Sequence, residues 1–134
     1  MECITTNSKK NNDNTVFLSA ENKFSIKIRD DIKKFVELNS GGHPVKDIIL
    51  VDGEEYEIRV FLSMDKNDKN YYIEKPMNYF LDKTKGKIVP IGIDSGDNYY
   101  CVNNENGKVY YWSADENQYY CIANCVDEFI VYFE

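Results

Sequence analysis

An α+β fold is the class that this sequence predicts, with an antiparallel β-sheet of about five to six strands arranged as a meander and flanked by helices. Between Lys87 and Ala123, short runs rich in tyrosine, valine and isoleucine alternate with turns that contain glycine, asparagine or aspartate. One strand and one turn recur about every ten residues, which is typical of an antiparallel meander. Three other segments, 30–39, 75–85 and 125–134, have the apolar spacing of helices.

The length and charge of the chain limit what it can bind. At 134 residues it is long enough for one domain with a sizeable core. Its net charge of −7 argues against direct binding to nucleic acid phosphates. The same charge would attract a basic protein and speed its docking, although it also serves solubility. Eleven tyrosines are present, and a tyrosine can pack its ring while its hydroxyl reaches water or a partner.

No apolar run reaches the length of a membrane span, and the first residues lack the apolar centre of a signal peptide. We therefore expect a cytoplasmic protein that does not contact a membrane. In that compartment its four cysteines are expected to be free thiols rather than a disulfide framework.

The N-terminal part divides into a polar segment and the start of the domain. Residues 1–14 are rich in asparagine and lysine and predict a flexible N-terminal segment, so that residues 15–134 form a single domain. The stretch 15–28 predicts an early strand or an irregular apolar arm, because Phe24, Ile26 and Ile28 alternate as on a strand.

A helix and a hairpin are predicted next. Asp30 or Asp31 can cap a helix whose apolar stripe ends before Gly41, and the stripe consists of Ile32, Phe35, Val36 and Leu38. Two apolar runs then flank Asp52-Gly53, the strongest short signal for a β-hairpin. In the second run one face carries Tyr56, Ile58, Val60 and Leu62.

The second half of the chain predicts a helix, four strands and a closing helix. The first helix begins near Lys75, with Pro76 in its first turn, and ends before Gly86. Strands follow over 87–94, 98–103, 108–113 and 119–123, and Pro90 indicates a sheet edge or a strand start. Asn124 or Cys125 would be the N-cap of the closing helix, and a thiol is a poor cap.

Catalytic and metal-binding patterns are weak. Asp94, Gly96, Asp97 and Glu105 superficially resemble a calcium loop, but the glycine and glutamate spacing does not match an EF-hand. Cys121-x3-Cys125 has no second pair at zinc-ligand spacing, and the single histidine is distant in sequence. Asp94 and Asp115 could form an acid–base pair, but surface charge is the better explanation in so acidic a chain. We therefore expect no enzymatic activity, no metal and no cofactor.

Several short motifs occur in one order and resemble the SUKH superfamily, which includes cell-wall-synthesis regulators of the SMI/KNR type and many bacterial immunity proteins. The resemblance runs from about Phe24 to the C-terminus and is carried by three groups of residues and Phe129 in the closing helix. They are Gly41 and Gly42; then Pro90, Gly92, Asp94, Gly96 and Asn98; then Gly107, Val109, Tyr110 and Trp112. Many relatives begin with a further helix that contains an acidic residue and a Leu-Pro pair, and neither is evident here.

The resemblance implies a fold and a function. The SUKH-like fold is an antiparallel sheet backed by helices, as the strand spacing also predicts. The implied function is that of a non-enzymatic immunity protein, which binds a cognate toxin domain, a nuclease being one candidate, and blocks it. The partner-binding surface would be acidic and rich in tyrosine, and its candidate residues are Asp94, Asp97, Tyr99, Tyr110, Trp112, Asp115 and Glu116.

Two other functions remain open: a regulatory scaffold, and a module that binds a peptide or small molecule in a groove between sheet and helices. The oligomeric state is also open between a monomer and a weak homodimer that pairs through an exposed strand.

Overall fold

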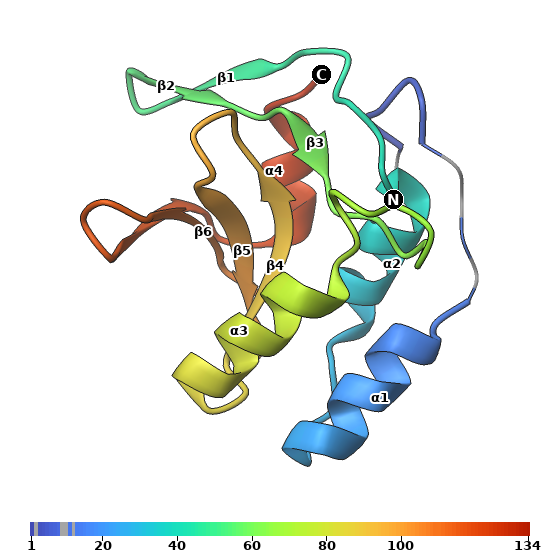
Figure 1. Cartoon of the computed structure of the whole chain (residues 1–134). Coiled ribbons are helices and arrows are strands. Elements are labelled where there is room, and N and C mark those ends of the chain that lie inside the picture. Colours follow the sequence, from blue (N-terminus) through green and yellow to red (C-terminus); the bar gives the residue numbers. More distant parts are fainter. Residues whose placement is uncertain (2, 9–10, 12) are drawn as a thin grey trace.

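Helices and antiparallel strands build the molecule, so the predicted α+β class is confirmed (Figure 1). The computed structural model describes residues 1, 3–8, 11 and 13–134. The elements in chain order are α1 (Thr15–Phe24), α2 (Asp30–Asn39), β1 (Ile48–Val51), β2 (Glu54–Glu57), β3 (Val60–Phe61), α3 (Glu74–Thr84), β4 (Ile88–Ile93), β5 (Tyr99–Asn103), β6 (Val109–Ser113), β7 (Gln118–Ala123) and α4 (Val126–Val131).

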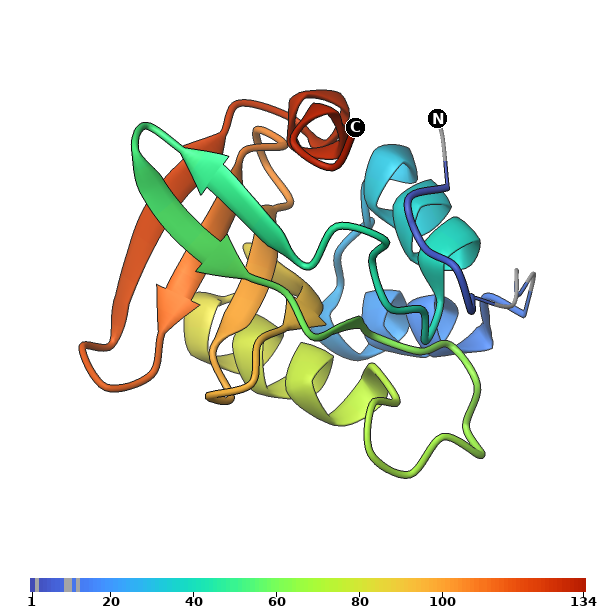
Figure 2. The same ribbon diagram turned by 90° about the horizontal axis from the view of Figure 1, so that it is seen from above.

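The strands form two antiparallel sheets. The larger sheet has five strands in the order β3-β4-β5-β6-β7, so strands consecutive in the chain are neighbours and the predicted meander is confirmed. The hairpin β1-β2 is a separate two-stranded sheet. Figure 2 shows this hairpin lying across the larger sheet, with α4 beside it. The hairpin and the larger sheet therefore form two layers.

The Asp-Gly turn forms the predicted hairpin. Asp52 has φ 51° and Gly53 has φ 83°, and Val51 pairs with Glu54 across the two-residue loop. Two successive positive φ angles give the turn whose twist matches that of the strands, and asparagine, aspartate and glycine tolerate them best.

Directly after β2 the chain moves from one sheet to the other. The backbone N–H of Ile58 donates to the carbonyl of Asp47 at 2.8 Å, which continues the hairpin. The next N–H, that of Arg59, donates to the carbonyl of Ile93 at 2.9 Å in the larger sheet. The single apolar run predicted after the turn is therefore divided between β2 and β3, which pair with different partners.

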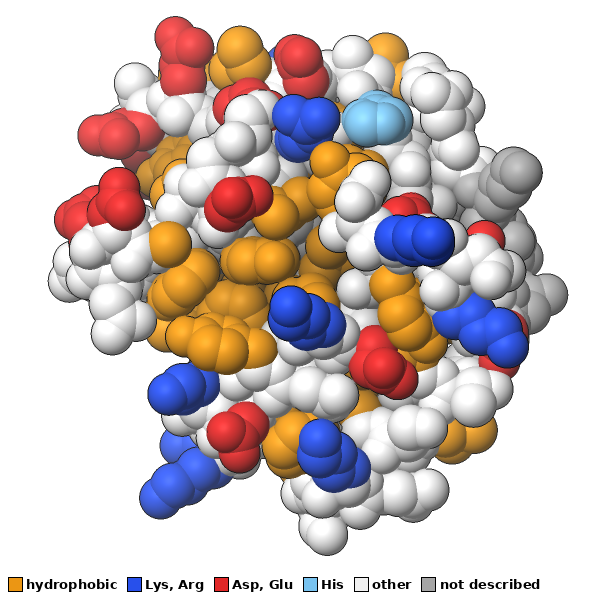
Figure 3. All heavy atoms as spheres, in the orientation of Figure 1, with side chains coloured by type: hydrophobic (Ala, Val, Ile, Leu, Met, Phe, Trp, Pro, Cys, Tyr) orange, Lys and Arg blue, Asp and Glu red, His pale blue; other side chains and the backbone are white. Residues whose placement is uncertain are grey.

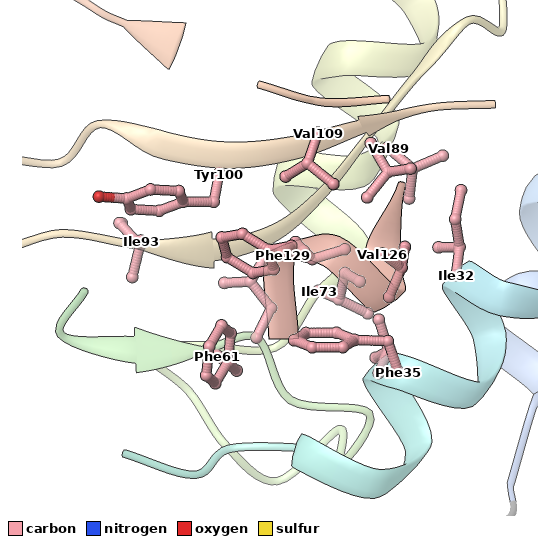
Figure 4. Packing of buried hydrophobic residues seen from close by; sticks show 14 of the residues in the cluster. Ile32, Phe35, Phe61, Ile73, Val89, Ile93, Tyr100, Val109, Val126 and Phe129 are labelled. Atoms are coloured by element: carbon pink, nitrogen blue, oxygen red, sulfur yellow. The ribbon is translucent and has the colours of Figure 1, made fainter. Parts of the chain in front are cut away.

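The main core lies between the larger sheet, α2, α4 and the hairpin (Figure 4). Phe35 of α2 packs edge-on against Phe61 of β3 at a ring-centroid distance of 5.1 Å, and Phe129 of α4 lies 6.0 Å from Phe35. Tyr100 of β5 completes the group at 6.1 Å from Phe129. A second, smaller cluster lies on the opposite face of the sheet, where Phe80 of α3 packs with Ile88 and Cys101.

The predicted helices are present, with one wrong detail. The helix α2 begins at Asp30 with Arg29 at the N-cap, so neither Asp30 nor Asp31 caps it. Both carboxylates instead lie in the first turn, where the helix dipole favours negative charge. Pro76 lies in the first turn of α3 as predicted, and the helix ends at Thr84 before left-handed Lys85.

The closing helix α4 has Cys125 at its N-cap, one of the two predicted positions. The Cys125 sulfur accepts the backbone N–H of Glu128 at 3.4 Å. Asp127 and Glu128 lie in the first turn, where they favour the same helix start.

Pro90 lies inside the sheet rather than at its edge or at a strand start, because β4 is flanked by β3 and β5. The short β3 pairs only with Gly92 and Ile93, so no β3 residue is paired with Pro90. The register with β5 also shifts between Pro90 and Gly92. A proline is tolerated in a sheet at such an irregularity.

The expectation of a strand or irregular arm over 15–28 is wrong, because Thr15–Phe24 is a helix. Its buried residues Val16, Phe17 and Ala20 follow helical spacing. The alternation of Phe24, Ile26 and Ile28 covers only the end of this helix and the segment that leads to α2. A helix before α2 is the element that the sequence did not show clearly.

The flexibility of residues 1–14 and the domain division at residue 15 stay predictions, and residues 2, 9, 10 and 12 lie outside the described residues. Within the described part, Ile4 is buried and Thr5 forms an antiparallel bridge with Pro44. A Cβ added to Gly42 would come within 2.7 Å of the Thr5 side chain, so the glycine permits this close approach.

Substitutions in α1 distinguish a helix from a strand. Val16 and Phe17 are adjacent and both buried, whereas Leu18 is 50% exposed. A strand with one face exposed to solvent would bury only one of two neighbours. We expect Phe17→Ala to lower the free energy of unfolding by about 3 kcal/mol or more and Val16→Ala by about 2 kcal/mol. Leu18→Ala is the control and should cost well under about 1 kcal/mol in urea unfolding. A small effect of either Val16→Ala or Phe17→Ala would contradict the helix.

Candidate protein-binding surfaces

Strand alternation divides the predicted partner-binding residues between the two faces of the larger sheet. Tyr99, Tyr110 and Trp112 lie on the face that α3 partly covers: Phe80 of α3 contacts the rings of Tyr99 and Trp112 edge-on, and Tyr110 packs against Tyr119. Tyr100 and Tyr111 point to the opposite face, toward the main core and the hairpin. The predicted partner-binding residues therefore lie on two separate surfaces and not on a single one.

The first surface is an aromatic groove of about 520 Å³ between α3, the loop before it and the strands. Phe80 forms its buried floor, while Trp112 and Tyr99 are half-buried and Tyr79 is 49% exposed. Figure 3 shows hydrophobic side chains gathered beside α3, with both basic and acidic side chains around them. The residues that line the aromatic groove are Leu62, Lys69, Asn70, Tyr71, Tyr72, Lys75, Pro76, Tyr79, Phe80, Ile93, Asp97, Tyr99, Trp112 and Ala114.

The second surface is an acidic cleft of about 550 Å³ between the hairpin and the ends of β4, β6 and β7. Carboxylates and tyrosines make up its entire lining, which consists of Glu54, Glu55, Tyr56, Glu57, Asp94, Tyr111, Glu116 and Tyr120. In Figure 3 acidic side chains gather at the upper left, over the hairpin tip and the turn between β6 and β7. Asp115 is exposed on that turn but does not line the cleft.

Asp94 organises the loop between β4 and β5. One carboxylate oxygen accepts the backbone N–H groups of Gly96 at 2.9 Å and Asn98 at 2.8 Å. The other accepts the Tyr111 hydroxyl at 2.7 Å. The Asp94 side chain is therefore engaged within the molecule, and its charge, rather than a free carboxylate, is what it offers a partner.

Hydrogen bonds also hold the hairpin against the larger sheet. The Tyr100 hydroxyl donates to the backbone carbonyl of Glu57 at 2.8 Å, and the Glu57 carboxylate accepts the Ser95 N–H at 2.9 Å and the Ser95 hydroxyl at 2.8 Å. The rings of Tyr56 and Tyr111 meet at a centroid distance of 5.3 Å. The cleft is thus a fixed gap between two layers.

The tyrosines of the cleft remain protonated donors. Burial, followed by the hydrogen bond to Asp94 and the charge of that carboxylate, raises the pKa of Tyr111. The hydrogen bond to Glu116, made at 2.6 Å, is the main cause that raises the pKa of Tyr120. Burial, with smaller effects from Glu54 and Asp52, raises the pKa of Tyr56.

Among the described residues, the lining of the acidic cleft contains no lysine or arginine. In the same part of the chain, the ion pairs are Arg29–Asp31, Lys33–Glu21 and Lys87–Glu105, all outside the cleft. Five carboxylates therefore share one hollow, and no ion pair is found there among the described residues. Such a site suits a lysine or arginine side chain from a partner, which tyrosine rings can also contact face-on.

Within the described residues, no group of three or more histidine, cysteine, aspartate or glutamate side chains is placed to hold a metal ion. The single histidine, His43, lies on the surface, where its Nδ1 is 2.8 Å from the Arg59 carbonyl oxygen. Cys101 is buried, and Cys3, Cys121 and Cys125 are exposed. Of the helices that the structure describes, none has the length and apolar character to cross a bilayer.

These features define a small α+β domain that offers two hollows on an antiparallel meander. Residues 13–131 match the SMI1 / KNR4 family (SUKH-1), and the chain belongs to this family. The resemblance found in the sequence motifs is thereby confirmed. The chain is also similar to the SPbeta prophage-derived uncharacterized protein YokK of Bacillus subtilis (strain 168), with 31% identity over 68 residues. That similarity covers 48% of this chain and only 35% of YokK.

Sequence reasoning missed the hairpin side of the acidic cleft. Glu54, Glu55, Tyr56 and Glu57 follow the Asp-Gly turn directly, and this acidic run is visible in the sequence. What the sequence does not show is that the hairpin folds over the ends of the strands and brings these residues to Asp94 and Glu116.

Alkaline pH tests the buried tyrosine that joins the two layers. Burial, with smaller effects from neighbouring tyrosines and carboxylates, raises the pKa of Tyr100. A tyrosine in the unfolded chain has a pKa of about 10. As the pH rises, the tyrosine of the unfolded state therefore loses its proton first. The free energy of unfolding keeps its full value below about pH 10 and falls as the pH rises further. We expect Tyr100→Phe to lower the free energy of unfolding at pH 7 by about 1 kcal/mol. The variant should also lose less of this free energy at alkaline pH, as measured by urea unfolding at several pH values. An unchanged alkaline slope would contradict the assignment.

Proposed function

We propose that this protein is a non-enzymatic immunity protein that binds a cognate toxin domain through the acidic cleft. Membership of the SUKH family supports this role, because the family is commonly linked to toxin immunity and is generally non-enzymatic. The single observation that carries the proposal is the composition of the cleft, which the described residues line with five carboxylates and three tyrosines and with no lysine or arginine.

The cleft supplies both attraction and contact. The −7 charge of the chain draws a basic surface toward it, and the uncompensated carboxylates attract that surface most strongly at the cleft. Tyr120, which is 37% exposed, and half-buried Tyr56 then offer rigid aromatic area of the kind that dominates interface energies. A nuclease, whose active surface must be basic to hold phosphates, is the partner class that these features fit best.

The binding residues that we propose combine the sequence-derived set with the hairpin. Asp94 and Glu116 remain in the set, and the hairpin adds Glu54, Glu55 and Tyr56. Asp115 lies close enough in sequence to contribute charge from the neighbouring turn. Tyr99, Tyr110, Trp112 and Asp97 are on or beside the α3-facing side and are not part of this cleft.

Charge reversal in the cleft tests the proposal with a toxin domain encoded beside this protein. Glu54 and Glu116 are exposed, so the double variant Glu54→Lys/Glu116→Lys should fold. We expect its association rate with the toxin domain to fall about tenfold or more at low salt, and its protection of growing cells to fall with it. The measurements are stopped-flow association at several salt concentrations and growth after co-expression.

A matched control carries the same change in net charge elsewhere. Asp82 on α3 and Glu105 on the turn between β5 and β6 are exposed and do not line the cleft. Asp82→Lys/Glu105→Lys should slow association only slightly. Equal slowing by both pairs would show that net charge alone matters, and full protection by the cleft variant would place the toxin on another surface.

A further inference from the structure

The aromatic groove on the α3 face has features that toxin binding at the acidic cleft does not use. Phe80 and Trp112 meet at a centroid distance of 5.1 Å with an interplanar angle of 88°, and Phe80 meets Tyr99 at 5.4 Å and 74°. Tyr79 adds a further ring 6.5 Å from Trp112. Edge-to-face rings at these distances are in direct contact, so they form one continuous aromatic surface on which flat, compact apolar side chains can pack.

Hydrogen-bond donors predominate in this groove. Among the described residues, the tyrosine hydroxyls that donate or accept side-chain hydrogen bonds are those of Tyr71, Tyr100, Tyr111 and Tyr120. The hydroxyls of Tyr79 and Tyr99 are thus available to a ligand. The indole of Trp112 and the ammonium groups of Lys69 and Lys75 can only donate. The one carboxylate in the lining is Asp97.

The charge of the groove is opposite in sign to that of the rest of the molecule. Two lysines and one aspartate line it, whereas the chain as a whole carries −7 and no cation lines the acidic cleft among the residues that the structure describes. Neither Lys69 nor Lys75 is in an ion pair within the described part of the chain. A partner that supplies carboxylates and carbonyl oxygens, but few N–H donors, is complementary to this lining.

We propose that the aromatic groove binds an extended, proline-rich segment of another protein, flanked by acidic residues. Proline has a carbonyl acceptor but no N–H donor, which matches a lining rich in donors. Proline-rich chains form a polyproline II helix that rises about 3.1 Å per residue and leaves its carbonyls free for tyrosine and tryptophan donors. Proline rings pack on the aromatic surface of Tyr79, Tyr99 and Trp112, and Lys69 and Lys75 meet the flanking carboxylates.

This surface is independent of the proposed toxin-binding function, because the acidic cleft and the groove share no lining residue. The volume of the groove, about 520 Å³, lies in the range of ligand sites, which supports the alternative that this protein binds a peptide between sheet and helices. One chain can thus hold a basic protein on one face and an acidic proline-rich segment on the other.

The only tryptophan of the chain, Trp112, reports directly on this groove. The probe is a synthetic peptide in which a run of prolines is flanked by glutamates. We expect a saturable change in Trp112 fluorescence, with binding confirmed by calorimetry. Tyr79→Ala removes an exposed wall of the groove and should weaken binding about tenfold or more. Lys75→Glu should weaken it severalfold, and more so at low salt.

Three controls make the test decisive. Tyr120→Ala removes a comparably exposed tyrosine from the acidic cleft and should bind the peptide like the unmodified protein. A peptide with lysines in place of the glutamates, and one with glycines in place of the prolines, should both bind more weakly. The proposal is overturned by no saturable binding, by equal binding of either control peptide, or by a Tyr120→Ala variant that loses as much affinity as Tyr79→Ala.

Discussion

The acidic cleft depends on the point where the chain leaves one sheet and enters the other. Ile58 hydrogen-bonds within the hairpin and Arg59 within the larger sheet. Beside this point, the Glu57 carbonyl accepts the Tyr100 hydroxyl, and the Glu57 carboxylate accepts the Ser95 N–H and hydroxyl. These bonds fix the height and angle of the hairpin over the sheet. The acidic cleft is the space that remains between the hairpin and the larger sheet.

The two-residue period of β-strands then assigns each tyrosine to a face. Neighbours such as Tyr99 and Tyr100, or Tyr111 and Trp112, point to opposite sides of the sheet. One side gathers rings beside α3 with two lysines, and the other gathers hydroxyls against carboxylates. A single tyrosine-rich sequence therefore produces two chemically different surfaces. In the functions that we propose, each surface binds a partner of opposite charge.

Local patterns predicted most of the fold. The Asp52-Gly53 turn and the regular strand spacing are local signals, and the structure bears them out. The helix α1 escaped prediction because Phe24 at its end and Ile26 and Ile28 after it alternate like a strand, and burial against α3 decides between the two patterns. The sequence identified Asp94 and Glu116 as candidates by their charge. It did not predict that they lie in one cleft with Glu54 and Glu55, because this depends on contacts between segments far apart in the sequence.

The central claim is that the cleft between the hairpin and the sheet is the toxin-binding surface. Hydrogen–deuterium exchange of the protein with and without the toxin domain is the most direct test. We expect the toxin domain to slow exchange in the hairpin at 54–57 and in the turn and strand at 115–120. Exchange in α1 and α2 should change little. Protection confined to those helices, with the hairpin unaffected, would contradict the claim.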